Sequence, residues 1–306
     1  MTLTAFQGAL ELGLIYGLLA LGIFISFRIL NVADLTVDSS FTTGGAVSAL
    51  LTLAGHPYLG LLAGFTVGSL AGLITAFLQT KLKIQPILAG ILTMTGLYSI
   101  NLLIMGGSPN ISLLGSDTVY TPVAALLGND LSKLAAVFVL ALLICILLPV
   151  FFKTQLGLSI RATGDNEDMV RASSINSDFT KTIGLMLSNG LVGLSGAALC
   201  QYQSFVDVNM GTGMVIVGLA SLIIGEIIFG KRGILRHVVA VVLGSCVYRI
   251  IIALVLQANL SASYLKLISA LIVTLAISYP AVREKFRFAR RKHAKRPTGV
   301  SEEKGE

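Results

Sequence analysis

One stretch of this chain constrains its fold more than any other. From Ile84 to Ser116 there is no Lys, Arg, Asp or Glu. A soluble domain typically carries about 25% charged residues because its surface is wet, whereas this chain is 12% charged and 55% hydrophobic. A helix that crosses a bilayer core needs about 20 mostly apolar residues. The sequence therefore predicts an integral membrane protein.

Nine stretches are long and apolar enough to be membrane helices, which satisfy their backbone hydrogen bonds internally, as lipid demands. We expect these spans at about 4–27, 36–54, 58–80, 84–106, 131–152, 180–200, 212–230, 235–257 and 264–282. The expected fold class is all-α, a polytopic membrane helix bundle with about nine transmembrane helices. We expect a transmembrane domain over 1–282 and a basic cytoplasmic C-terminal tail over 283–306.

The basic residues indicate how the chain is oriented. They gather in the connections after the third, fifth and seventh spans, and eight of them lie between Arg283 and Arg296. An excess of Lys and Arg marks the cytoplasmic side, so the N-terminus is expected outside and the C-terminus inside. The basic tail suits anionic membrane lipids. The net charge of +7 is therefore not interpreted as a nucleic-acid footprint.

The second predicted span opens with unusually polar sequence. Asn31, Asp34, Asp38 and Thr42 precede the pair Gly44-Gly45. Polar, irregular backbone at membrane depth is tolerated only where it is buried in protein or lines a wet cavity. Two interpretations stay open: a cytoplasmic turn with an Asp N-cap, or a discontinuous helix that enters the membrane.

A short internal similarity is also present. The segment 68–73, GSLAGL, resembles the segment 189–194, NGLVGL. In the expected topology the two helices run in opposite directions, which would fit an inverted repeat, a common plan of transporters. Small residues at this spacing also serve close helix packing, and this alternative stays open.

Charged residues inside a membrane span are functional candidates. Glu11 and Arg249 have opposite charge and similar expected depth, so an ion pair is expected. It is either a tie between helices or a contact for a polar solute. Glu226 is expected either to snorkel towards the membrane surface or to pair with the following loop, 230–233. The substrate-pathway candidates are Glu11, Asn31, Asp34, Asp38, Thr42, Thr93, Asn101, Asn189 and Arg249.

No spacing of His, Cys, Asp or Glu predicts a metal site, and no Ser/His/Asp or Cys/His set is evident. The chain is therefore expected to be a transport protein and not an enzyme.

One long polar connection, 153–179, is expected on the cytoplasmic side. A simple return turn would need far fewer residues. Asn166 is a good N-cap for a short helix, and Met169, Ala172 and Ile175 would share one face of it. We expect an amphipathic cytoplasmic coupling helix that docks in a partner's groove; a solvated surface helix is the alternative.

The run 156–176, LGLSIRATGDNEDMVRASSIN, resembles the cytoplasmic loop of bacterial ABC importer permeases of the branched-chain amino acid and ribose type. The residues that match are Gly157, Arg161, Ala162, Gly164, Asn166, Arg171 and Ile175. Ser174 stands where that family usually has Gly. The run 13–45, GLIYGLLALGIFISFRILNVADLTVDSSFTTGG, is similar to the family's first two helices. With Asp34 and Asp38 it resembles a subgroup that works with a lipoprotein for aromatic amino acids.

The resemblance implies a bacterial inner-membrane permease subunit for a branched-chain or aromatic amino acid. Its implied partners are a second copy of the chain (a homodimer), an ABC ATPase subunit and an extracytoplasmic substrate-binding protein or lipoprotein. ATP and Mg would be bound by the ATPase, because this chain has no GxxxxGK[ST] loop. No cofactor is expected here. The residues implied in coupling to the ATPase are Gly157, Arg161, Ala162, Gly164, Asp165, Asn166, Met169, Arg171, Ala172 and Ile175.

Two alternatives remain for the function. Permeases for sugars or nucleosides have similar sequences, so the substrate stays open. A secondary transporter driven by an ion gradient would need an intramembrane carboxylate relay, for which Glu11 is the best-placed acid.

The expected orientation can be tested with tags at the two ends of the chain. In intact cells an N-terminal tag should react with a membrane-impermeant reagent, and a C-terminal tag should react only after permeabilisation. Both tags on one side of the membrane would contradict an odd number of spans.

Overall fold

The computed structural model describes residues 3–231 and 233–257 and, beyond them, residues 267, 270, 271, 274 and 278. The ninth expected span and the basic tail lie outside the continuously described residues, and so does Arg232.

Each of the first eight expected spans coincides with a helix. They are α1 (Leu3–Ile23), which continues as the π-helical turn η1 (Phe24–Ile29), α2 (Val37–Leu53), α3 (Pro57–Thr80), α4 (Pro86–Ile104), α6 (Asn129–Phe151), α9 (Ser177–Gln203), α10 (Met214–Phe229) and α11 (Ile234–Gln257). Within the described residues, six of these are long and apolar enough to cross a membrane, whereas α2 and α10 are shorter. The expectation of a polytopic helical bundle is confirmed.

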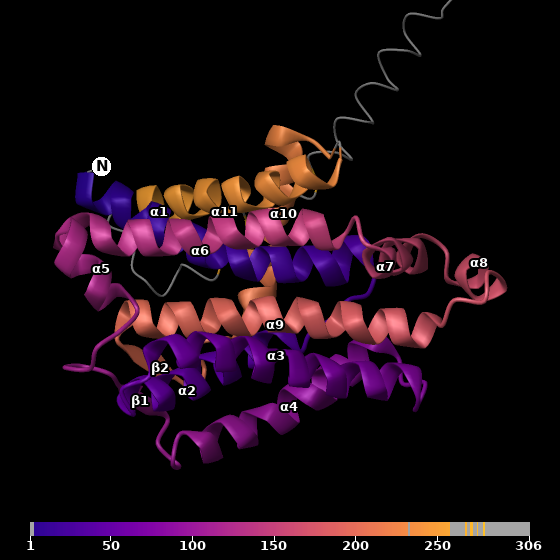
Figure 1. Ribbon diagram of the computed structural model, residues 1–306, viewed down its shortest axis with the longest axis horizontal. Helices are drawn as coiled ribbons and strands as arrows, with labels where there is room; N and C mark the ends of the chain where they lie inside the picture. Colours follow the sequence, from indigo (N-terminus) through magenta and orange to yellow (C-terminus); the bar gives the residue numbers. More distant parts are fainter. Residues whose placement is uncertain are drawn as a thin grey trace, which may run out of the picture.

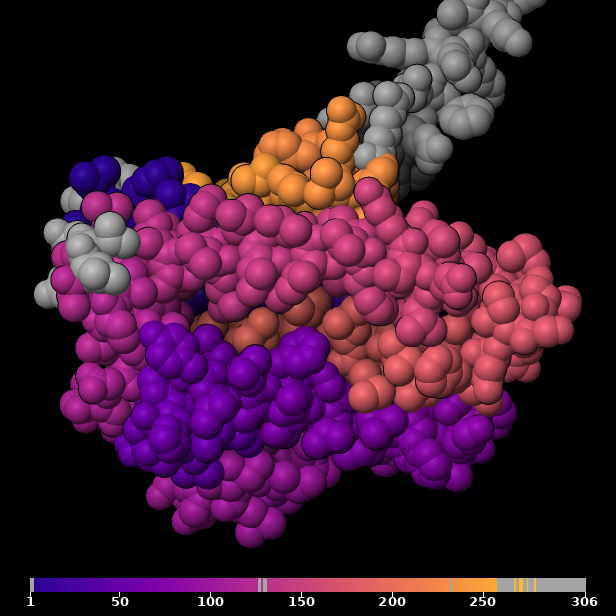
Figure 2. All heavy atoms as spheres, in the orientation of Figure 1, coloured from indigo at the N-terminus to yellow at the C-terminus, as the bar shows by residue number. Residues whose placement is uncertain are grey.

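Helix α9 occupies the centre of the bundle. Figure 1 shows it between a group formed by α1, α6 and α11 and a group formed by α2, α3 and α4. Its middle is almost entirely buried, from Ser188 to Gln201. The helices α7 (Gln155–Asp165) and α8 (Glu167–Ala172) project beyond one end of the bundle. In the space-filling view they form that end of the molecule (Figure 2).

At the opposite end lie α5 (Tyr120–Leu127) and two short strands, β1 (Asn110–Ser112) and β2 (Phe205–Asp207). The strands pair antiparallel, with Ile111 opposite Val206. The expected all-α class therefore needs a small correction. Both strands and α5 lie in connections between long helices, where hydropathy gives no signal for structure.

Glycines allow α3 and α9 to pack in direct backbone contact. Gly68 faces the backbone of Asn189, and Gly64 and Gly193 face one another, so a Cβ at any of these positions would overlap the neighbouring helix. Lipid gives apolar side chains little reason to associate, so close backbone approach is a main source of helix–helix attraction in membranes. The two similar segments, 68–73 and 189–194, are thus facing surfaces of one helix pair.

Helix α2 begins deep inside the bundle. Residues 31–36 have no helical structure, and Ser40 in the first turns of α2 contacts Asn189, the midpoint of α9. The chain therefore leaves η1, rises in irregular form beside α9, and becomes helical only next to the middle of α9. Of the two interpretations of 31–45, the discontinuous helix agrees with the structure and the simple turn does not.

The glycine contact predicts a strong effect of one added side chain. Gly68→Val should lower the thermal unfolding temperature of the purified protein, because overpacking costs about 1–3 kcal/mol and here the obstacle is the backbone of α9. The matched control is Gly96→Val on α4, where a new Cβ meets no atom within 4 Å. Equal unfolding temperatures for the two variants would contradict the packing described.

Candidate functional site

Asp34, Ser40 and Asn189 form a buried polar cluster at the middle of the bundle. The Asn189 amide donates a hydrogen bond of 2.6 Å to Asp34 Oδ2, and the Ser40 hydroxyl donates one of 2.7 Å to Asn189 Oδ1. Asp34 Oδ1 accepts from the backbone N–H of Thr36, whose hydroxyl lies 2.7 Å from that of Thr75 on α3. These contacts hold the irregular segment 31–36 against two helices.

Asp38 joins the N-terminal ends of two short helices. It lies in the first turn of α2, and its carboxylate accepts hydrogen bonds of 2.9 Å from the backbone N–H groups of Gly213 and Val215 at the start of α10. The first N–H groups of a helix have no partner within the helix, and its N-terminus is electropositive. Asp38 therefore caps α10, and its negative charge stabilises the electropositive N-terminus of α2.

A cavity of about 290 Å³ adjoins this junction. It lies between α2, α4 and the connection that precedes α10. The side chains that line it are a mixture of hydroxyl, amide, carboxylate, aromatic and thioether groups: Asp38, Ser39, Thr42, Met94, Thr95, Tyr98, Val208, Asn209 and Thr212. A polar solute with an apolar side chain could be accommodated by such a lining.

The remaining pathway candidates are dispersed. Thr42 lines the cavity, and its hydroxyl accepts from the Gly211 N–H. The Thr93 hydroxyl bonds within its own helix. Asn101 is buried, and its Oδ1 has no partner among the described residues. Asn31 is exposed at the turn, where its left-handed backbone (φ 55°) reverses the chain.

The expected Glu11–Arg249 ion pair is wrong for the described structure. Glu11 instead accepts hydrogen bonds from the Tyr202 hydroxyl (2.8 Å) and the Gln7 amide (3.0 Å). The Arg249 guanidinium stacks on the ring of Tyr16, 3.8 Å from its centroid. Aromatic neighbours therefore separate the two charges, and residue depth alone could not reveal them.

Glu226 pairs with the following loop, as expected, and also with two other helices. Lys231 Nζ lies 2.9 Å from its carboxylate, and His237 Nε2 on α11 is equally near. Arg28 at the end of η1 forms a bidentate pair with it. The Arg28 contact was not predictable from local sequence, because Arg28 and Glu226 lie far apart along the chain.

The connection 153–179, expected on the cytoplasmic side, is more structured than predicted, because it begins with α7. Thr154 caps this helix by accepting from the Gly157 N–H. A Cβ on Gly157 would overlap the Phe151 carbonyl, and one on Gly164 would overlap the carbonyl of Ile29 in η1. Both glycines of the motif therefore hold α7 close to the bundle. Residue spacing could have indicated α7, since Gly157, Ile160 and Thr163 are its buried positions.

Asn166 caps α8, as predicted, by accepting from the Met169 N–H at 3.0 Å. The predicted extent of the helix is wrong, since α8 ends at Ala172 and Ile175 lies beyond it. Ser174 has a left-handed backbone (φ 61°), which ends the helix and turns the chain towards α9. A glycine adopts this conformation at least cost, which is a physical reason for the Gly of the family pattern at the position of Ser174.

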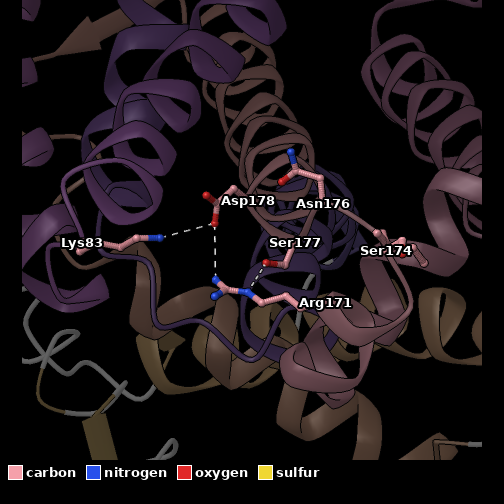
Figure 3. Close-up of a pocket in the computed structure, with 7 residues that line it drawn as sticks. Lys83, Arg171, Ser174, Asn176, Ser177 and Asp178 are labelled. Carbon is pink, nitrogen blue, oxygen red and sulfur yellow. Dashed lines mark hydrogen bonds and ion pairs between the residues drawn. The ribbon is translucent and has the colours of Figure 1, made fainter.

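Ion pairs tie α8 to the start of α9. Glu167 accepts from Arg171 at 2.8 Å and from Lys181 at 2.5 Å, and the Lys181 hydrogen bond lowers the pKa of the Glu167 carboxyl. Asp178 lies 3.7 Å from both Arg171 and Lys83 (Figure 3). Lys83, Arg171 and Asp178 line a cavity of about 370 Å³. The turn between α3 and α4 and the coupling loop are thereby linked.

The other loop candidates are available for contact. Met169 is 54% exposed, and Asp165, Ala172 and Ile175 are exposed beside it. Arg161 and Ala162 are half-buried on α7, and Arg161 has no hydrogen bond or ion pair with any described residue. Within the described part of the chain, no group of three His, Cys, Asp or Glu side chains could hold a metal ion.

Comparison with known proteins gives one family. Residues 6–277 match the family model described as branched-chain amino acid transport system / permease component. A tyrosine transport system permease protein of Clostridioides difficile is 38% identical over 85% of this chain and 86% of its own length. A probable branched-chain amino acid transport permease of Methanocaldococcus jannaschii is 28% identical over 78% of this chain and 76% of its own.

More distant relatives carry other solutes or show only the fold. The ribose import permease of Escherichia coli is 24% identical over 80% of this chain and 75% of its own. The solved structure of PsaBC from Streptococcus pneumoniae in complex with Fab has a TM-score of 0.50 and 15% identity, over 89% of both chains.

The capping role of Asp38 predicts a loss of stability on its removal. Asp38→Ala leaves the Gly213 and Val215 N–H groups without their acceptor, and each buried donor left unpaired costs about 1–3 kcal/mol. The variant should unfold at lower temperature and be cleaved faster by protease before α10. Asp117→Ala, at an exposed position, is the control. Unchanged stability of Asp38→Ala would contradict the capping role.

Proposed function

Because this chain belongs to the family of branched-chain amino acid transport system permease components, we propose that it is the membrane-spanning subunit of an ATP-binding cassette importer. It forms the translocation pathway for a small polar solute. ATP is hydrolysed by a separate ATPase subunit, which binds the ATP and Mg.

The projecting α7–α8 loop is the observation that carries this proposal. Its motif residues Gly157, Gly164, Asn166 and Arg171 have contacts within the chain that fix the shape of the loop. Its exposed apolar side chain Met169 is left for a partner. A short rigid helix with one exposed apolar residue suits insertion in a groove of another protein.

The proposed pathway passes the mid-bundle cavity beside Asp38. Two helix N-termini converge there and the Asp38 carboxylate already occupies them, so the groups left for a solute are the hydroxyl, amide, aromatic and thioether side chains of the lining. Tyr98 and Met94 supply surface for an apolar or aromatic side chain. Together with the 38% identity to a tyrosine transport permease, this favours an amino acid, and tyrosine first, over ribose.

We propose that two copies assemble around one pathway, since a homodimer presents two equivalent loops to an ATPase dimer. The loop end is cytoplasmic, and the end with the two strands faces an extracytoplasmic binding protein or lipoprotein. An inverted repeat would relate α1–α3 to α9–α11. The support for it is that α2 and α10 are both short and begin at the same junction.

The docking proposal predicts that one exposed side chain controls assembly. Met169→Glu should abolish co-purification of the ATPase encoded beside this chain, because a charge would enter an apolar groove. The unfolding temperature of the permease should be unchanged, because the side chain is exposed. Leu114→Glu, 84% exposed at the opposite end, should leave assembly intact. ATPase binding that survives Met169→Glu, and also Arg161→Ala, would overturn the proposal.

A further inference from the structure

Helices α1 and α11 pack closely along one face of α11. Gly13 on α1 lies against Cys246, where an added Cβ would come within 2.7 Å of the Cys246 Cα. One turn further along, Gly17 contacts Val242. Ser245 and Arg249 share this face of α11, one helical turn apart. Ser245 lies at the middle of α11 and Arg249 in its C-terminal half, which is the extracytoplasmic half in the proposed orientation.

Two polar groups on this face have no hydrogen-bond partner among the described residues. Arg249 Nε is buried without a hydrogen bond, and so is the hydroxyl oxygen of Ser245. The contact found for the guanidinium within the described chain is the stacking on Tyr16 at 3.8 Å. A buried polar group without a partner costs free energy, and a charge inside a membrane span costs more. A missing acceptor is therefore indicated next to Arg249.

Among the described residues, the acid expected nearest to this place is already engaged. Glu11, the acid in the outer half of the predicted spans, is held by Tyr202 and Gln7. The sequence from 258 to 282 contains no Asp or Glu, so that segment cannot supply a counter-ion. Lys133 lies 4.9 Å from the centre of the Tyr202 ring and adds a second positive charge nearby. The surroundings are therefore suited to an anionic oxygen ligand.

We propose that Arg249 and Ser245 bind the carboxylate of the transported amino acid at an outer site, before the solute reaches the cavity beside Asp38. A guanidinium can donate two parallel hydrogen bonds to a carboxylate, and Tyr16 holds it in one orientation. Glu11 retains acceptor capacity for an ammonium group. Tyr16 and Tyr202 provide aromatic surface for the side chain. The inference rests on the proposed function and adds to it the residues that recognise the amino-acid backbone.

The test measures ligand binding to the full chain in nanodiscs by saturation-transfer NMR. The probes are L-tyrosine, 3-(4-hydroxyphenyl)propionate, which keeps the carboxylate, and tyramine, which lacks it. The wild-type protein should bind both carboxylates at least tenfold more tightly than tyramine. Arg249→Gln should weaken both to the level of tyramine, and Arg249→Lys should restore part of the difference. Arg236→Gln, an exposed position on the same helix, should behave as wild type.

Three outcomes would overturn the inference. One is an undiminished preference for carboxylates in Arg249→Gln. Another is that the wild-type protein binds tyrosine no more tightly than tyramine. This result does not depend on the folding of any variant. The third is an anionic phospholipid retained by the wild type in native mass spectrometry and lost from Arg249→Gln, with tyrosine binding unchanged. If no amino acid binds to any form, the proposed substrate class fails as well.

Discussion

The architecture depends on one carboxylate between two helix ends. Asp38 lies in the first turn of α2 and caps the start of α10. Without it, two N-termini would face one another at the middle of the bundle, and their unpaired N–H groups would be costly away from water. Because Asp38 accepts from the first N–H groups of α10 and places a negative charge in the first turn of α2, both short helices can begin at mid-bundle beside a polar cavity. This junction is therefore the point where α2 and α10 begin inside the bundle, and it borders the cavity of the proposed pathway.

The rest of the bundle holds this junction in place by close packing. Gly64, Gly68 and Gly193 bring α3 against α9, and Asn189 at the midpoint of α9 holds Asp34 and Ser40. Near the loop end, Glu226 joins η1, α10 and α11 through Arg28 and His237. The loop is attached to the same framework, since Gly164 packs on Ile29 of η1. If a partner displaced α7, the contact between Gly164 and Ile29 would transmit the displacement to η1 and hence to α1.

Hydropathy and local motifs were enough to predict the eight helices that coincide with expected spans, the cap at Asn166 and the pairing of Glu226 with its loop. Contacts between residues far apart in the sequence were not predictable in the same way. The partner of Glu11 is Tyr202 and not Arg249, because rotation of each helix about its axis decides which side chains meet. Similarly, Asp38 was a polar candidate, but its role depends on where α10 begins. Helix α7 was missed because its buried face holds one large apolar residue, Ile160, between Gly157 and Thr163, which gives a weak hydrophobic period.

A disulfide cross-link between α2 and the middle of α9 tests the discontinuous helix most directly. Ser40 and Asn189 would be replaced by cysteine in a background with Cys145, Cys200 and Cys246 changed to Ala, and oxidised in membranes. The structure predicts efficient cross-linking of this pair, because the two native side chains are in hydrogen-bond contact, and none between Ser40→Cys and Lys181→Cys. If α2 instead began at the cytoplasmic surface, Ser40 would link to position 181 and not to 189, which would contradict the account.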